Sequence, residues 1–380
     1  MKNFYPDQYR NDSSYAIKHN YLHDQFSDHD QILAKIKNVV LGADFTLGSQ
    51  VDAFEEEVAA LLDVSHVVGV NSGTDAIFLS LYAAGIRPGD EVITTSFTFY
   101  ATVGAIGSLG ATPVFVDIGE DFNLDPRSLE AAITPKTKAI VPVHWAGRPC
   151  DMDEISVIAS RHNLVVVEDA CHGILGEYKG RKIGSLGDFG CFSLHPLKNL
   201  NVWGDGGFIC VNDPEMAQRL RLLRNHGLQD RDTCVVYGFN SRLDTVQAVV
   251  ARHMLEKLPQ LTEARIKNSE TLDRGLMGIT ELSIPPRLHC NKEVFHLYCF
   301  RASRRDDLIK WLQANGVDAK IHYPTAMHLQ PASRNLGYAE GDFPVAERAA
   351  RETVSLPVHE FVSDDDLHSM ISLITEFYGN

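Results

Sequence analysis

Three short segments of the chain contain residue types that can act together on a small molecule. Asp169 lies just past the apolar run 164–167, and Lys198 follows a second apolar run, 191–194. The third segment joins the apolar run 66–70 to Ser72-Gly73-Thr74 and then to a helical pattern. An acid, an amine and the start of a helix are groups that can hold and activate a cofactor.

Each segment taken alone also has a purely structural explanation. An acid at the carboxyl end of a parallel strand faces the ligand crevice, but it more often caps a helix or forms an ion pair. Lys198 has apolar or small neighbours; burial there would lower its pKa and free the neutral amine that imine formation requires, although most lysines are exposed. Ser72-Gly73-Thr74 would present backbone N–H groups to a phosphate, or Ser72 or Thr74 would be a plain N-cap.

Together the three segments meet the needs of one cofactor. Pyridoxal 5'-phosphate requires a cradle for its phosphate, a lysine that forms a Schiff base with it, and an acid that keeps its pyridine nitrogen protonated. Ser72-Gly73-Thr74, Lys198 and Asp169 supply these groups in one chain. The sequence therefore predicts a pyridoxal-phosphate site.

The elements that must position this site form an α/β pattern. Short apolar runs alternate with helical stretches, which is typical of a mostly parallel sheet covered on both faces. The runs are 66–70, 91–95, 113–117, 139–143 and 164–167, and the helical stretches include 51–62, 76–84, 99–109 and 152–162. After Arg242 a long helical region, 243–278, leads into a smaller segment with its own strands and helices, so we expect a second domain.

Composition excludes several classes of partner. The 380-residue chain has a net charge of −15, which argues against a broad surface for nucleic acid or for an anionic membrane. Its seven cysteines are dispersed and have no CxxC spacing, so we expect reduced thiols and no metal site. No run approaches the roughly 18 apolar residues that span a membrane, and residues 1–14 show no signal peptide. These features predict a soluble cytoplasmic protein.

The order of the motifs resembles that of the DegT or StrS family of sugar aminotransferases. The resemblance runs from DFTLGSQVDAFEEE at 44–57 through VVVEDACH and HPLKNL to FPVAERAARETVSLPVHE near the end. It implies a fold type I pyridoxal-phosphate transferase, like aspartate aminotransferase. We expect a large cofactor-binding domain over 1–260, including the segment 1–50, and a smaller carboxyl-terminal α+β domain over 261–380.

The resemblance assigns roles around the cofactor ring. Lys198 looks like the lysine that forms the Schiff base and then carries the proton, and Asp169 looks like the partner of the pyridine nitrogen. His172 lies where the family has His or Gln, near the phenolic oxygen of the cofactor. Phe99 looks like the aromatic residue that stacks on the ring, with Phe97 and Tyr100 as nearby alternatives and core packing as the structural explanation for all three.

The resemblance also implies how the phosphate is held. Gly73, Thr74 and Asp75 would bind it mainly through the backbone, and Ser193 through its hydroxyl. Asn240 resembles the asparagine that reaches the phosphate across a dimer interface. This implies a homodimer with shared active sites.

The same resemblance implies which residues contact the substrate. Arg242 is a candidate contact for a substrate anion or, equally, part of a structural ion pair. Structural hydrogen bonding is also a close alternative for the histidines of the last third of the chain. The candidate substrate contacts are Leu47 with its neighbours Thr46 and Gly48, His195, Arg242, His322, Tyr323 and His328.

The expected reaction is transamination by alternation of the cofactor between its pyridoxal and pyridoxamine forms. Glutamate or glutamine would donate the amino group, and a nucleotide-linked 3-keto or 4-keto deoxysugar would accept it. Relatives that aminate C-3 tend to have the motif SFYPGKN where this chain has SLHPLKN. The motifs GDGG and NSRLD, however, are closer to those of the relatives that act at C-3, so amination at C-3 is favoured over amination at C-4. Three alternatives are a keto-cyclitol acceptor, a sugar dehydratase, which Lys198 argues against, and a regulatory protein that binds the cofactor without turnover.

Overall fold

The computed structural model describes residues 15–19 and 21–379. The prediction that no signal peptide is present concerns residues 1–14, which lie outside this range. Within it, no helix is both long and apolar enough to cross a membrane.

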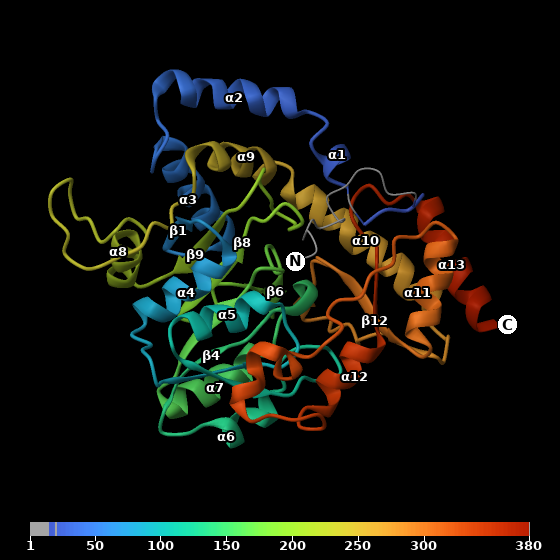
Figure 1. The fold of residues 1–380 in the computed structure, drawn as a ribbon. Coiled ribbons are helices and arrows are strands. Elements are labelled where there is room, and N and C mark those ends of the chain that lie inside the picture. The colour runs from blue at the N-terminus through green and yellow to red at the C-terminus, as the bar shows by residue number, and fades with distance from the viewer. Residues whose placement is uncertain (1–14, 20, 380) are drawn as a thin grey trace.

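A seven-stranded sheet forms the centre of the molecule (Figure 1). The four pairings among β3, β2, β4, β5 and β8 are parallel, whereas β9 runs antiparallel to both β8 and β1. The expected mostly parallel sheet is thus confirmed. In spatial order the strands are β1 (His66–Val70), β9 (Gly207–Val211), β8 (Phe189–Ser193), β5 (Val165–Asp169), β4 (Thr137–Val141), β2 (Glu91–Thr95) and β3 (Thr112–Val116).

Successive side chains of these strands point to opposite faces of the sheet, and both faces are covered by helices. On one face, Val68 and Ile209 pack in a core that includes residues of α4, α5 and α8. On the other, Val67 and Phe208 pack in a core with residues of α3 and α9, and α2 lies on the outer side of α9. The helices of the two layers are α2 (His29–Gly42), α3 (Ser49–Leu62), α4 (Gly73–Ala83), α5 (Tyr100–Ser108), α6 (Leu129–Ala132), α7 (Met152–His162), α8 (Pro214–Leu223) and α9 (Thr245–Leu255).

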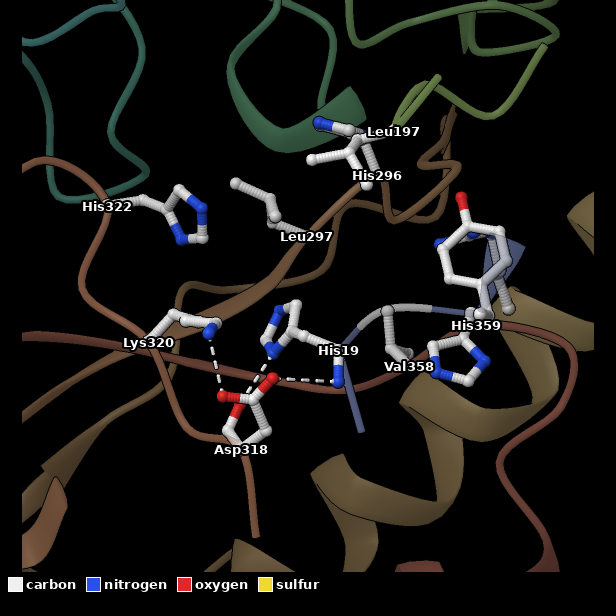
Figure 2. A pocket seen from close by; sticks show the side chains of 11 residues that line it. His19, Leu197, His296, Leu297, Asp318, Lys320, His322, Val358 and His359 are labelled. Carbon is white, nitrogen blue, oxygen red and sulfur yellow. Dashed lines mark hydrogen bonds and ion pairs between the residues drawn. The ribbon is translucent and has the colours of Figure 1, made fainter. Parts of the chain in front are cut away.

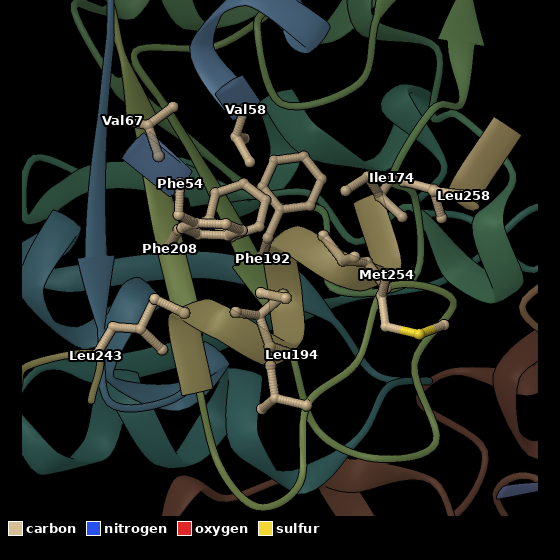
Figure 3. Packing of buried hydrophobic residues seen from close by; sticks show 14 of the residues in the cluster. Phe54, Val58, Val67, Ile174, Phe192, Leu194, Phe208, Leu243, Met254 and Leu258 are labelled. Carbon is tan, nitrogen blue, oxygen red and sulfur yellow. The ribbon is translucent and has the colours of Figure 1, made fainter. Parts of the chain in front are cut away.

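Aromatic and branched side chains fill the layer between the sheet and α3 and α9 (Figure 3). The rings of Phe192 on β8 and Phe208 on β9 stack with their centroids 4.6 Å apart, and Phe54 of α3 meets Phe208 edge-on. All three rings are buried. This packing fixes β8, the strand that leads into Lys198, against the outer helices.

The remaining third of the chain builds a second core around a three-stranded antiparallel sheet. That sheet has the order β10 (Leu282–Ser283), β12 (Tyr298–Ala302) and β13 (Thr353–Leu356), and α10 (Leu258–Leu276), α11 (Arg305–Ala314) and α13 (Asp364–Gly379) cover it. The domain boundary expected at 260 falls at the start of α10 and remains a prediction. Smaller elements are α1 (Leu22–Gln25), α12 (Pro344–Glu352), β6 (Glu177–Tyr178), β7 (Arg181–Lys182) and β11 (Asn291–Lys292).

The long helical region predicted over 243–278 is confirmed. It consists of two helices, α9 and α10, with Glu256 and Lys257 between them. Pro259 lies in the first turn of α10, where its missing N–H costs nothing but where it prevents continuation of a preceding helix.

Candidate active site

A cavity of about 510 Å³ lies where the ends of β5 and β8 meet the start of α4. Its volume is within the range of small-molecule sites. Ten of the residues predicted from the sequence line it: Gly73, Thr74, Phe99, Asp169, His172, Ser193, His195, Lys198, His322 and Tyr323. Residues from both cores of the chain therefore meet around one space.

The start of α4 forms one wall of this cavity. Ser72 is the N-cap of α4, and its hydroxyl accepts a hydrogen bond from the backbone N–H of Asp75 at 3.1 Å. A Cβ on Gly73 would lie 2.7 Å from Cβ of Ser193 and 2.8 Å from Sγ of Cys171, so only glycine permits this close approach of α4 to β8. Since a helix start attracts anions, this wall is suited to a phosphate beside the Ser193 hydroxyl.

Asp169 is buried at the end of β5, and hydrogen bonds orient its carboxylate. The Thr102 hydroxyl of α5 donates to Oδ2 at 2.7 Å, and the backbone N–H of Cys171 donates to Oδ1 at 3.2 Å. The Thr98 hydroxyl lies 2.9 Å from that of Thr102 and extends the network. Asp169 thus presents a fixed acceptor to the cavity.

The neighbouring Glu168 anchors the end of the same strand. Its carboxylate, fully buried, accepts hydrogen bonds from the backbone of Gly184, Leu186 and Gly187 and from Nε2 of His144 at 2.8 Å. The backbone N–H of His144 in turn donates to the carbonyl oxygen of Asp169 at 3.1 Å. The two acids therefore have different roles: Glu168 stabilises the loop 184–187 by hydrogen bonds, and Asp169 faces the cavity.

Lys198 follows β8 in a turn that its own backbone closes, because its N–H donates to the carbonyl oxygen of His195 at 2.8 Å. Burial lowers the pKa of Lys198, and the nearby Cys171 and Asp169 oppose the shift. The lowered pKa increases the fraction of neutral amine, which is the form that attacks a carbonyl.

His172 is buried beside Lys198, and its tautomer follows from its contacts. Its Nδ1 accepts a hydrogen bond from the backbone N–H of Ala146 at 3.2 Å, so the proton of the neutral ring is on Nε2. Burial, with a smaller contribution from the charge of Lys198, lowers the pKa of His172 well below its usual value. His172 is therefore a neutral donor, as expected of a residue that hydrogen-bonds a phenolic oxygen.

Of the three aromatic candidates, Phe99 lines the cavity, whereas Phe97 and Tyr100 do not. Phe97 is buried in a separate core with Phe122 and Trp145. Phe99 is half-exposed at the N-cap of α5, and its ring lies 5.9 Å from that of Tyr323. Phe99 is thus placed to cover a planar ligand.

Seven predicted residues are not among those that line the cavity of this single chain. The Asp75 carboxylate accepts a hydrogen bond from Ser241 at 2.6 Å, and Arg242 donates to the side chain of Asn225 at 3.1 Å. Buried His328 contacts Glu347 at 3.1 Å, which corresponds to the structural alternative. The other four are Thr46, Leu47, Gly48 and Asn240.

Several residues of the cavity carry no signal that sequence patterns could have revealed. Thr98 and Thr102 lie in SFTFYAT, in which only the aromatic residues were predicted to contact the cofactor. The two threonines nevertheless form the hydrogen-bond network around Asp169. His296 comes from far along the chain, and its ring lies 4.3 Å from that of His172. The third such case is Asp205, within the GDGG turn.

These contacts fit the cofactor that the sequence predicts. The residues present provide an anion-binding helix start, a buried acid and a lysine with a lowered pKa around one cavity. The cradle at Gly73 is closed to any larger residue, as expected where a backbone must approach a phosphate closely.

Comparison with known proteins gives a consistent result. Residues 27–375 match the model of the DegT/DnrJ/EryC1/StrS aminotransferase family. The chain is 42% identical to a pleiotropic regulatory protein of Geobacillus stearothermophilus, over 92% of this chain and 94% of that protein. It is 41% identical to the dTDP-3-amino-3,4,6-trideoxy-alpha-D-glucose transaminase of Streptomyces venezuelae, over 90% and 91% of the two chains.

A third relative is the UDP-N-acetyl-3-dehydro-alpha-D-glucosamine 3-aminotransferase of Acidithiobacillus ferrooxidans, which is 40% identical over 91% of this chain and 93% of its own. Among solved structures, S. venezuelae DesV in complex with a ketimine intermediate superposes with a TM-score of 0.92 at 40% identity, covering 94% of this chain and 97% of DesV. NtdA of Bacillus subtilis, with bound pyridoxamine phosphate, superposes with a TM-score of 0.89 at 28% identity, covering all of this chain and 90% of its own.

Proposed function

The chain belongs to the DegT/DnrJ/EryC1/StrS aminotransferase family, and we propose that it aminates C-3 of a nucleotide-linked keto sugar. It is an enzyme, a transaminase that uses pyridoxal 5'-phosphate. One observation carries the proposal: Lys198, Asp169 and the start of α4 all border the same cavity.

The residues of this cavity would divide the binding of the cofactor among them. Gly73, Thr74 and the Ser193 hydroxyl would hold the phosphate, with Asp75 contributing through its backbone. Thr102 and Cys171 orient the carboxylate of Asp169. This carboxylate would accept a hydrogen bond from the pyridine nitrogen and so keep that nitrogen protonated. Phe99 would cover one face of the ring and His172 would donate from Nε2 to the phenolic oxygen.

Bound pyridoxal phosphate supplies an electron-withdrawing ring that stabilises negative charge on the substrate carbon from which a proton is removed. Lys198 would hold the cofactor covalently through Nζ. After displacement by the amino donor, its Nζ would take up that proton and would deliver it to the carbon of the cofactor that carries the aldehyde in the free form. Because burial lowers the pKa of Lys198, its amine can act as this base.

The acceptor is proposed from the relatives and from the cavity. The names of two relatives specify amination at C-3 of a dTDP-linked or a UDP-linked sugar. His195, His322 and Tyr323 line the cavity and would contact the sugar. The amino donor would be glutamate or glutamine, with Arg242 as a candidate contact for an anionic group of substrate or donor.

A homodimer with shared active sites is part of the proposal. The loop between α8 and α9 projects from the body of the chain (Figure 1), and Tyr237 within it is 90% exposed. Val235, also in this loop, and Phe45, which follows α2, are half-exposed, and Leu41 in the last turn of α2 is largely exposed. Large exposed apolar side chains of this kind suit a subunit interface, across which Asn240 would reach the partner's cofactor phosphate.

Two other functions remain alternatives. A keto-cyclitol acceptor would use the same cofactor groups and differ only in the contacts of the sugar. One relative is named a pleiotropic regulatory protein, which suggests regulation without turnover, but the aminotransferase family and the presence of Lys198 together with Asp169 and Ser193 at the cavity favour catalysis.

Single-turnover assays distinguish these functions. Protein loaded with pyridoxamine phosphate should convert a 3-keto nucleotide sugar to the amine and should leave a scyllo-inosose-type keto-cyclitol unchanged. Conversion of the cyclitol alone would establish the first alternative. Absence of any exchange with glutamate, glutamine or keto acceptors would favour the regulatory one.

A further inference from the structure

A second, smaller cavity adjoins the catalytic one. It measures about 100 Å³, and Leu197, His296, Leu297 and His322 border both spaces. Figure 2 shows Leu197 and His296 at one end of the view, with His19, Asp318 and Lys320 at the other. Because liquid water occupies about 30 Å³ per molecule, the cavity has room for roughly three waters or one small substituent of a ligand.

The histidines around this cavity offer acceptors. Nδ1 of His19 lies 2.8 Å from the carbonyl oxygen of Asp318, so Nδ1 carries the proton and Nε2 has a lone pair. Nδ1 of His296 lies 3.3 Å from Oδ1 of Asn199, whose Nδ2 donates to the carbonyl oxygen of Val294. Because Oδ1 can only accept, Nδ1 of His296 carries the proton and its Nε2 has a lone pair. Burial lowers the pKa of His19 to about 4 and that of His296 well below its usual value, so both rings are neutral near pH 7.

A tyrosine hydroxyl adds a group without a partner. Tyr21 lines the cavity and is only 5% exposed, and its Oη makes no hydrogen bond of good geometry among the described residues. Burial raises the pKa of Tyr21, and the nearby Arg265 opposes the shift. The ring is held in place by stacking on His359 and by the guanidinium of Arg265 above it. A buried hydroxyl left unpaired is costly, so a ligand that pairs with it gains affinity.

The charges of the cavity are already balanced. Lys320 lies 2.7 Å from the Asp318 carboxylate, and Arg265 lies 3.3 Å from that of Glu360. No group of three or more potential metal ligands is suitably placed within 15–19 and 21–379. A carboxylate has no proton to donate to the imidazole nitrogens, and a methyl group would leave them unpaired. The chemistry therefore favours a neutral hydroxyl.

We infer that this cavity is a specificity subsite for the exocyclic hydroxymethyl group of the sugar acceptor. Ring hydroxyls are attached directly to the pyranose, whereas the hydroxymethyl arm extends one carbon further and can pass the partition formed by His296, Leu297 and His322. His19 and Tyr21 would then hydrogen-bond its hydroxyl. The inference rests on the proposed function and makes it narrower: the preferred sugar keeps its C-6 hydroxyl and is neither 6-deoxy nor a uronate.

The test compares UDP-glucose with UDP-xylose, which lacks only the hydroxymethyl group, by calorimetric titration of the cofactor-loaded protein. The dTDP-linked pair is titrated in parallel, so that nucleotide preference does not decide the outcome. We expect the glucose conjugate to bind about 5- to 150-fold more tightly, as two hydrogen bonds imply, and UDP-glucuronate to bind more weakly than UDP-glucose.

Tyr21→Phe removes only the unpaired hydroxyl, and His19→Phe removes an acceptor and fills space. Each variant should reduce the preference for the glucose conjugate, and Tyr21→Phe should do so without loss of thermal stability. Tyr82→Phe is the matched control, because Tyr82 lies on α4 and outside both cavities. This variant should retain the full preference for the glucose conjugate.

Equal binding of the two conjugates by the unmodified protein, or an unchanged preference in Tyr21→Phe and His19→Phe, overturns the subsite and leaves the proposed function intact. Failure of every nucleotide sugar to bind refutes the nucleotide-sugar proposal, and the subsite with it.

Discussion

Replacement of Thr102 with valine tests how Asp169 is held. The two side chains have nearly the same shape, but valine cannot donate the 2.7 Å hydrogen bond to Oδ2 of Asp169. Thr102 is fully buried, so water cannot readily replace it. A hydrogen bond to a charged group contributes about 1.5–3 kcal/mol, which corresponds to a roughly 10- to 150-fold loss if the bond is fully used in the rate-limiting step.

The assay is the single-turnover rate of amino transfer from glutamate to the bound cofactor, followed by absorbance. Thr94→Val is the matched control, because Thr94 is equally buried and its hydroxyl donates to the backbone of Val141, on the neighbouring strand. We expect Thr102→Val to be at least about 10-fold slower than Thr94→Val. Equal rates in the two variants would refute the claim that Thr102 orients Asp169.

Four further changes probe the remaining groups. Lys198→Ala should abolish transamination while the protein still folds as a dimer, checked by activity and sedimentation; full activity would contradict the role of Lys198. Asp169→Ala should retain bound cofactor but lose at least about 100-fold in turnover, and near-normal turnover would exclude the pyridine contact. Gly73→Ala should weaken cofactor binding about 10-fold or more, because its Cβ would lie 2.7 Å from that of Ser193. An unchanged dissociation constant of the cofactor would contradict the claim that only glycine fits at this position. In cofactor-free protein, the rate of pyridoxal phosphate capture should rise with pH and level off below the usual lysine pKa of 10.5, since burial lowers the pKa of Lys198 and only the neutral amine reacts; a midpoint at 10.5 or above would contradict this.

Sequence patterns predicted several residues that meet around the cavity, because these residues lie at the ends of strands and at the start of a helix. Asp169 and Ser193 are the last residues of β5 and β8, and Gly73 is the first residue of α4. Near-continuous apolar runs revealed these strands. Strand β9 was not among the predicted runs, and apolar runs do not reveal strand direction, so its antiparallel course was not predicted either.

Contacts between distant segments were beyond sequence patterns. His296 reaches the cavity from the second part of the chain, and Tyr21 lies in a segment with no recognisable motif. The network from Thr98 through Thr102 to Asp169 depends on how α5 packs against β5, which no local spacing encodes. The roles predicted for Asn240 and His328 also depend on packing, and both remain predictions.

The central claim is that Lys198 holds pyridoxal phosphate and that the protein uses it for transamination. The most direct test is the absorbance spectrum of the purified protein before and after addition of glutamate. We predict a band of lysine-bound cofactor that is replaced by the band of the pyridoxamine form, and loss of the first band in Lys198→Ala. Absence of any such band after reconstitution with pyridoxal phosphate would contradict the account.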